Sequence, residues 1–89
     1  MRREVEIVNE LGLHARPAAE FVRTVRDFDC DVFIIKGDAR FSADSIMEVL
    51  TANLDCGTRI TLEATGRDAE NALTRLEALL LAFREQEKA

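Results

Sequence analysis

Apolar residues in the first third of the chain change their spacing from every second residue to every third or fourth. Val5 and Ile7 alternate with glutamates, which predicts a strand with one buried face over about residues 3–8. From residue 15 onward the apolar positions recur at helical spacing and charged residues fill the opposite face, which predicts a helix over about 15–28. The chain therefore begins with a strand followed by an amphipathic helix.

The next stretch has the pattern of a hairpin. Residues 32–35 are β-branched and aromatic, residues 36–38 form a turn sequence around a glycine, and residues 39–42 predict the returning strand. The hairpin therefore adds two adjacent antiparallel strands.

A helix and another strand follow the hairpin. Ser45 with Glu48 three residues later is typical of a capping box, with Ser45 as the N-cap, and predicts a short helix over about 46–54. Strict alternation over 59–65 predicts a half-buried strand.

The last segment predicts a long helix with Asp68 as its N-cap and a frayed end over 85–89. Its apolar stripe consists of Ala72, Leu73, Leu76, Leu79, Leu80 and Phe83. The resulting order, β-α-β-β-α-β-α, predicts an α+β fold: an open-faced sandwich with a four-stranded antiparallel sheet, covered on one face by three helices.

Composition narrows the class of protein. The 89 residues predict a single domain over 1–89, and 47% hydrophobic with 33% charged residues is typical of a globular chain. The net charge of −5 and the lack of Trp and Tyr disfavour nucleic-acid binding, including a ferredoxin-like RNA binder. No stretch has the pattern of a membrane span or a signal peptide, so we expect a cytoplasmic protein that does not insert into membranes.

The metal-binding residue types are sparse. Cys30 and Cys56 are far apart in sequence and His14 is the only histidine, too few ligands for a zinc site. We expect no metal and no cofactor, and we expect both cysteines to be buried or half-buried free thiols, with a disulfide as the less favoured alternative.

His14 carries the chemistry that the sequence suggests. It directly precedes the first predicted helix, where unpaired N–H groups and the helix dipole favour an anion. Arg16 adds a guanidinium that can hold phosphate oxygens, and Pro17 is tolerated in a first helical turn. Because much imidazole is unprotonated at neutral pH, we interpret His14 as a residue that accepts and releases a phosphoryl group. The alternative is a polar helix cap without chemistry.

Two segments carry a family resemblance. Residues 12–18, Gly-Leu-His-Ala-Arg-Pro-Ala, are similar to the active-site motif of the HPr family, the histidine-containing phosphocarriers of the phosphoenolpyruvate-dependent sugar phosphotransferase system. Residues 45–47, Ser-Ile-Met, resemble the family's regulatory serine segment. The resemblance covers nearly the whole chain and implies the same open-faced fold.

The resemblance implies a relay rather than an enzyme. Enzyme I would pass a phosphoryl group from phosphoenolpyruvate to Nδ1 of His14, and His14 would donate it to an enzyme IIA domain. The Arg16 side chain and the backbone N–H groups of Ala15 and Arg16 would stabilise the phosphoryl group in transit. We expect a monomer.

The resemblance also implies a regulatory residue and a docking surface. Ser45 is either a helix cap or a phosphorylation site for an HPr kinase/phosphorylase, and Asp44 departs from the lysine often found before this serine. The expected partner-binding residues are Arg23, Arg26, Ile46, Met47 and Leu50. The main functional alternative is a regulatory phosphocarrier of a nitrogen-type branch, which binds partners according to its phosphorylation state without feeding a transporter.

Overall fold

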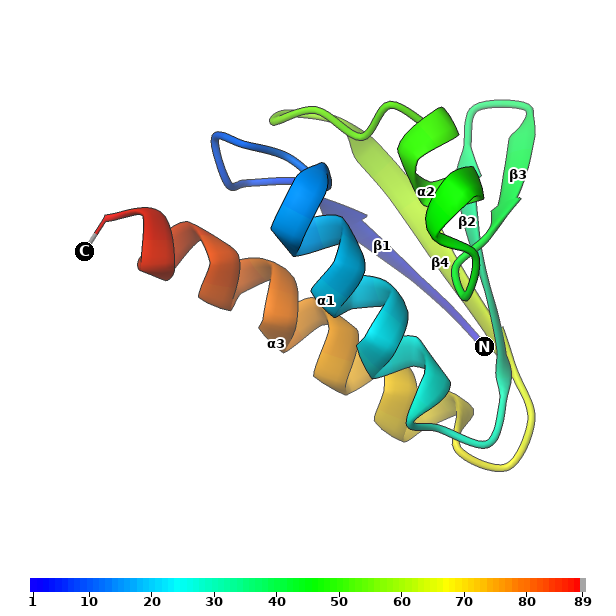
Figure 1. Cartoon of the computed structure of the whole chain (residues 1–89). Coiled ribbons are helices and arrows are strands. Elements are labelled where there is room, and N and C mark those ends of the chain that lie inside the picture. The colour runs from blue at the N-terminus through cyan, green and yellow to red at the C-terminus, as the bar shows by residue number, and fades with distance from the viewer. Residues whose placement is uncertain (89) are drawn as a thin grey trace.

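The computed structural model describes residues 1–88, which form one antiparallel sheet and three helices (Figure 1). The elements in chain order are β1 (Arg2–Glu6), α1 (Ala15–Arg26), β2 (Asp31–Lys36), β3 (Ala39–Ser42), α2 (Ile46–Thr51), β4 (Arg59–Thr65) and α3 (Ala69–Glu87). The strands pair in the order β1-β4-β2-β3. The predicted fold class and element order are confirmed.

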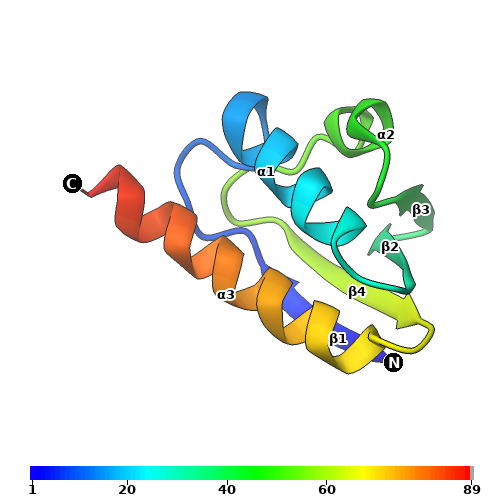
Figure 2. The ribbon, with the colours of Figure 1, turned by 60° about the horizontal axis from the view of Figure 1, so that its bottom comes forward.

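All three helices cover the same face of the sheet, and α1 lies between α2 and α3 (Figure 2). The strand register brings Ile34 opposite Leu62, and both side chains are fully buried beneath the helices. Phe21 of α1 and Leu76 of α3 are also fully buried. The alternation of β2 and β4 therefore supplies one wall of the core, and the apolar stripes of the helices supply the other.

The opposite face of the sheet is open and carries ion pairs. Glu63 lies between Arg2 and Arg40, with an oxygen 2.8 Å from a guanidinium nitrogen of each. The Arg40 guanidinium lies 4.1 Å from the centre of the Phe33 ring. The expected polar face therefore also contains an aromatic ring, which the arginine covers.

The first two elements end earlier than the sequence predicted. β1 ends at Glu6 rather than residue 8, because Ile7 leaves the regular ladder and exchanges backbone hydrogen bonds with Thr58 and Gly57. α1 ends at Arg26 rather than residue 28, since the next two N–H groups bond to carbonyls only three residues back.

The predictions for the last two helices also need correction. α2 ends at Thr51 rather than residue 54, because Asn53 adopts a left-handed φ of 54°. Asp68 is the N-cap residue of α3, but its carboxylate accepts a hydrogen bond from the Asp29 N–H instead of from the helix. The predicted fraying at residues 85–87 is wrong, because α3 continues to Glu87; residue 89 lies outside the described part of the chain.

Candidate functional site

His14 is the N-cap residue of α1, as predicted, with an extended backbone (φ −126°, ψ 160°). The N–H groups of Ala15 and Arg16 lie in the first turn, where a helix offers them no acceptor. Ala15 adopts a φ of +49°, a conformation that costs a residue with a Cβ about 1–2 kcal/mol. The local motif therefore places an imidazole beside unpaired N–H groups, on a backbone held in an unfavourable conformation.

The His14 ring has a partner that the sequence analysis missed. Its Nε2 atom lies 2.7 Å from Oδ1 of Asp55, in the loop between α2 and β4, 41 residues away in sequence. Both side chains reach solvent, with 36% of His14 and 61% of Asp55 exposed. Asp55 therefore contacts Nε2 of the ring, and the other ring nitrogen, Nδ1, is not part of this contact.

Two backbone contacts hold the loop of Asp55 against the segment that carries His14. The N–H of Leu13 donates to the carbonyl of Leu54 at 2.9 Å. Gly12, at φ +68°, packs so closely that a Cβ at this position would lie 2.4 Å from the Leu54 oxygen. The glycine is therefore required here both by its backbone conformation and by the close approach of the two loops.

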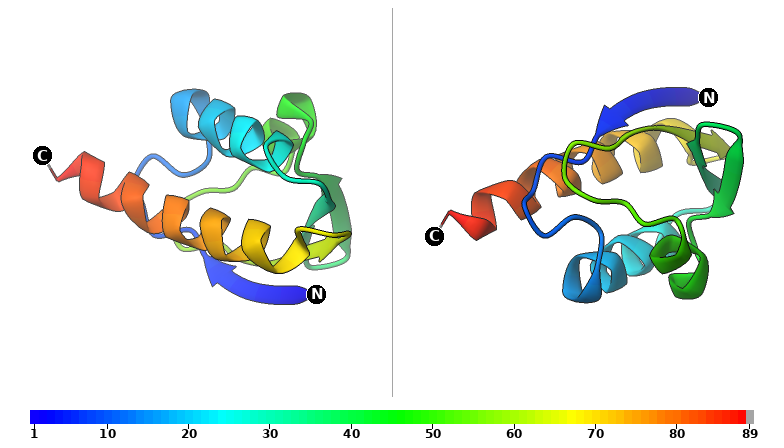
Figure 3. Two further views of the ribbon diagram at one scale, coloured as in Figure 1. Left: turned by 90° about the horizontal axis from the view of Figure 1, so that it is seen from below. Right: turned by 90° about the horizontal axis from the view of Figure 1, so that it is seen from above.

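The C-terminal end of α3 reaches the loop between β1 and α1, as Figure 3 shows. The Glu87 carboxylate accepts hydrogen bonds from the backbone N–H groups of Glu10 (2.6 Å) and Leu11 (3.2 Å) and from the side-chain amide of Asn9 (3.0 Å). Asn9 is fully buried, and its amide also donates to the carbonyl of Gly12. Desolvation raises the pKa of Glu87, but these donors outweigh it, so the net pKa lies below the ordinary value.

Arg16 faces the same end of α3. With Pro17 and Phe83 it lines a shallow hollow that also includes Leu11 and Glu87. None of the residues in 1–88 accepts a hydrogen bond from its guanidinium or pairs with it. Its fork of donors is therefore open to an anion from outside.

Ser45 caps α2, but the capping box is only half formed. The Ser45 hydroxyl oxygen accepts a hydrogen bond from the N–H of Glu48 at 3.3 Å. The expected return contact from the Glu48 carboxylate to the Ser45 N–H is absent, because that carboxylate accepts from the Ser42 N–H at 2.9 Å instead. Ser45 as a whole is half-buried.

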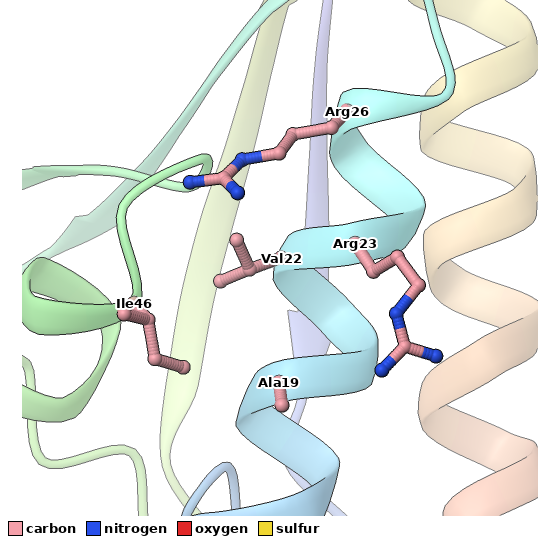
Figure 4. A pocket seen from close by; sticks show the side chains of 5 residues that line it. All are labelled: Ala19, Val22, Arg23, Arg26 and Ile46. Carbon is pink, nitrogen blue, oxygen red and sulfur yellow. The ribbon is translucent and has the colours of Figure 1, made fainter.

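The expected partner-binding residues lie on α1 and α2. Arg23, Arg26 and Ile46 line a hollow between these helices, together with Ala19 and Val22 (Figure 4). We call it the α1–α2 groove. The Arg26 guanidinium is anchored by two hydrogen bonds to the Asp44 carbonyl, at 3.1 and 2.7 Å. Arg23 makes no such contact, and its guanidinium points along α1 toward the His14 end in Figure 4.

Met47 and Leu50 of α2 do not line this groove but are exposed beside it. Met47 is 71% exposed and Leu50 is 41% exposed. The structure therefore brings Arg23, Arg26 and Ile46 together, and leaves Met47 and Leu50 as a separate apolar surface on the same short helix.

The described residues do not contain a metal-ligand cluster. In residues 1–88 no group of three or more histidine, cysteine, aspartate or glutamate side chains is arranged to hold a metal ion. No helix within this range is long and apolar enough to cross a membrane. Both cysteines are free thiols, but only Cys30 is half-buried; the expectation is wrong for Cys56, which is exposed in the loop between α2 and β4, outside the packed helices and strands.

Comparison with known proteins shows the family to which this fold belongs. The family model described as "PTS HPr component phosphorylation site" matches residues 1–82. The phosphocarrier protein HPr of Vibrio cholerae is 40% identical over 78 residues, which is 88% of this chain and 92% of the relative. The phosphocarrier protein NPr of Shewanella violacea is 38% identical over 80 residues, 90% of this chain and 88% of the relative.

Solved structures give the same result. A crystal structure of HPr from Thermoanaerobacter tengcongensis aligns with a TM-score of 0.91 and 34% identity, covering 96% of both chains. The chain belongs to the HPr family of phosphocarrier proteins of the phosphotransferase system.

Proposed function

We propose that this protein accepts a phosphoryl group on His14 from phospho-Enzyme I and donates it to an enzyme IIA domain during sugar uptake. The observation that carries the proposal is the His14 ring at the N-cap of α1, with Nε2 directed at Asp55 and the first-turn N–H groups beside it. This arrangement supports Nδ1 as the accepting nitrogen. The protein acts as a stoichiometric carrier, and the exchange takes place in the cytoplasm.

Arg16 and the backbone stabilise the phosphoryl group in transit. The Arg16 guanidinium, which has no acceptor within residues 1–88, supplies a charge-assisted contact, and the N–H of Ala15 supplies a neutral one. The site needs no metal or cofactor for this role, because positioning and charge stabilisation are the main requirements of phosphoryl transfer.

Enzyme I and the enzyme IIA domain dock on the α1–α2 groove through acidic surfaces of their own. Arg26 is held in place by the Asp44 carbonyl, so its charge is preorganised, and Ile46 offers an apolar contact across the groove from Val22 (Figure 4). Exposed Met47 and Leu50 extend the apolar contact. The chain acts as a monomer in these exchanges.

Ser45 is a control point at the edge of the docking surface. Phosphate at this N-cap position is compatible with the helix dipole, so the fold tolerates it. Beside Met47 it places negative charge where acidic partners dock, and an HPr kinase/phosphorylase would be the enzyme that adds it. A Ser45→Asp variant should weaken Enzyme I binding at low salt and keep its melting temperature near that of the parent.

The alternative function is a regulatory phosphocarrier of a nitrogen-type branch. This alternative is supported by the sequence identity to the Shewanella NPr, which at 38% is nearly as high as the 40% identity to the Vibrio HPr. Both functions use His14, so they differ in the partner rather than in the chemistry. Single-turnover transfer from the phosphorylated protein to a sugar-type and to a nitrogen-type enzyme IIA separates them.

The test of the shared chemistry is incubation with phosphoenolpyruvate and Enzyme I. The parent should gain one acid-labile phosphate, and His14→Ala should gain none while keeping its melting temperature. Arg16→Ala should slow transfer about tenfold to a hundredfold, the loss expected for one charge-assisted contact. Arg16→Lys keeps the positive charge but loses the forked guanidinium, so its transfer rate should lie between the rates of the parent and of Arg16→Ala. Acid-labile phosphate on the His14→Ala protein would refute the assignment.

A matched pair of variants tests the docking surface. Arg23→Glu reverses a charge in the groove and should raise the dissociation constant for Enzyme I. Arg75→Glu makes the same charge change on the exposed face of α3, outside the groove, and should have little effect. Equal weakening by both variants would show that only the net charge matters.

A further inference from the structure

The pairing of His14 with Asp55 is more constrained than an ordinary surface contact. The N–H of Asp55 donates to the Asn53 carbonyl at 3.1 Å, and its own carbonyl accepts from the Thr58 N–H at 3.0 Å. The same loop is tied to the His14 segment through Leu13 and Leu54. The carboxylate is therefore presented to the ring by a loop that is fixed on both sides of the contact.

The contact decides which ring nitrogen carries the proton. An ionised carboxylate only accepts hydrogen bonds, so an Nε2 atom 2.7 Å from Oδ1 of Asp55 must be the N–H donor. In the neutral ring the proton is then on Nε2, and Nδ1 holds the free electron pair. A histidine held this way by a carboxylate has one orientation and one tautomer before it reacts.

We propose that Asp55 is a positioning residue for His14: it holds the ring with the proton on Nε2 and balances the positive charge that the ring gains when Nδ1 takes the phosphoryl group. The inference rests on the proposed function of His14 as phosphoryl acceptor, and adds a residue that the local motif of residues 12–18 does not contain.

The transfer step shows where the charge goes. The electron pair on Nδ1 of His14 forms a bond to phosphorus, while the bond between phosphorus and the donor atom of phospho-Enzyme I breaks and its electron pair returns to that atom. The ring keeps its Nε2 proton and becomes cationic, and onward transfer reverses these changes. Asp55 contacts the Nε2 side of the ring and the phosphoryl group is bound to the Nδ1 side, so the carboxylate lies nearer the cationic ring than the anionic phosphoryl group.

The solvent exposure of His14 and Asp55 limits the effect of Asp55 on fold stability and on the transfer rate. Both side chains are partly open to water, and solvent screens such pairs, so Asp55 should contribute little to the stability of the fold. For the same reason its effect on the transfer rate is modest, about threefold to tenfold, as expected for one hydrogen bond to a charged group at a partly exposed site. A change of this size is well within the precision of single-turnover kinetics.

The experiment uses four variants of the full chain. Asp55→Ala removes the acceptor, Asp55→Asn keeps an oxygen without the charge, and Asp55→Glu restores a carboxylate on a longer side chain. Asp31→Asn is the control, because it removes one exposed carboxylate at the start of β2, and β2 starts at the opposite end of the sheet from the start of α1 (Figure 1). All four should melt close to the parent temperature.

The first readout is the ¹⁵N spectrum of the imidazole in alkaline buffer. His14 is the only histidine, so its two ring nitrogens are the only ones observed. In the parent and in Asp31→Asn, Nδ1 should resonate as an unprotonated nitrogen and Nε2 as a protonated one. In Asp55→Ala the two resonances should move toward each other as the second tautomer becomes populated. A parent ring with its proton on Nδ1 would overturn the proposal.

The second readout is the single-turnover rate of phosphorylation by phospho-Enzyme I. Asp55→Ala and Asp55→Asn should be about threefold to tenfold slower, Asp55→Glu should recover part of the rate, and Asp31→Asn should match the parent. Unchanged rates in the first two variants, or an equal loss in Asp31→Asn, would overturn the proposal. If the parent itself gains no phosphate, the proposed function fails, and the nitrogen spectra still decide whether Asp55 sets the tautomer.

Discussion

Gly12→Ala tests whether the close contact between two loops holds the candidate site together. The new Cβ would lie 2.4 Å from the Leu54 carbonyl oxygen, so that carbonyl must move and its hydrogen bond from the buried Leu13 N–H is lost. An unsatisfied buried N–H costs about 1–3 kcal/mol, and a left-handed φ on alanine costs about 1–2 kcal/mol. With a small gain from the less flexible unfolded chain, we expect a loss of about 2–4 kcal/mol.

Gly37→Ala provides the matched control. Gly37 has a similar positive φ of 59°, but a Cβ there meets nothing within 4 Å. The control therefore carries the backbone cost alone, and should lose about 0–1.5 kcal/mol. For a domain of this size the melting temperature should fall by about 10–25 °C in Gly12→Ala and by less than about 10 °C in Gly37→Ala.

Thermal unfolding followed by circular dichroism measures both variants. Amide hydrogen exchange adds a local readout, since Leu13 should lose protection in Gly12→Ala and keep it in Gly37→Ala. An equal loss of stability in the two alanine variants would refute this role of Gly12, because the close approach would then contribute nothing beyond the backbone conformation.

Three further outcomes follow from individual contacts. Because the pKa of Glu87 is lowered in the fold, its ionised carboxylate contributes fully to the stability of the fold above the ordinary pKa of 4.5, and this contribution disappears as the pH falls through the lower folded pKa. The difference in melting temperature between the parent and Glu87→Gln should therefore close below pH 4.5. Ser45→Ala loses the cap on Glu48 and should cost about 1 kcal/mol, measured by urea unfolding. Burial, followed by nearby carboxylates, raises the pKa of Cys30, so iodoacetamide should label exposed Cys56 first, as peptide mass mapping will show.

Short-range patterns in the sequence predict the fold well. The alternation over residues 59–65 predicts β4 with its correct bounds, because a strand with one buried face must alternate. The start of α1 at Ala15 and the cap at Ser45 are also local, since a cap residue acts on N–H groups two or three positions away. Both are therefore visible in a few consecutive residues.

The parts that the sequence did not predict depend on contacts between distant segments. Asp55 is an ordinary loop aspartate in the sequence, and only the fold brings it to His14. Glu87 lies in a segment whose charged composition favours fraying, yet the loop at Glu10 and Leu11 gives its carboxylate three donors and the helix continues. Glu48 has the spacing of a capping box, but the end of β3 offers it a better donor at Ser42.

The site is therefore built from three segments that are far apart in sequence. The loop before α1 supplies His14, the loop after α2 supplies Asp55, and the end of α3 secures the first loop through Glu87. Gly12 links these contacts, because its carbonyl accepts from the Asn9 amide, which also donates to Glu87, and a Cβ on Gly12 would collide with the Leu54 carbonyl oxygen. A change at Gly12 should consequently disturb the His14–Asp55 pair, whereas a change at Asp55 should leave the fold intact. This difference separates the residues that hold the site in place from the residue that acts on the ring.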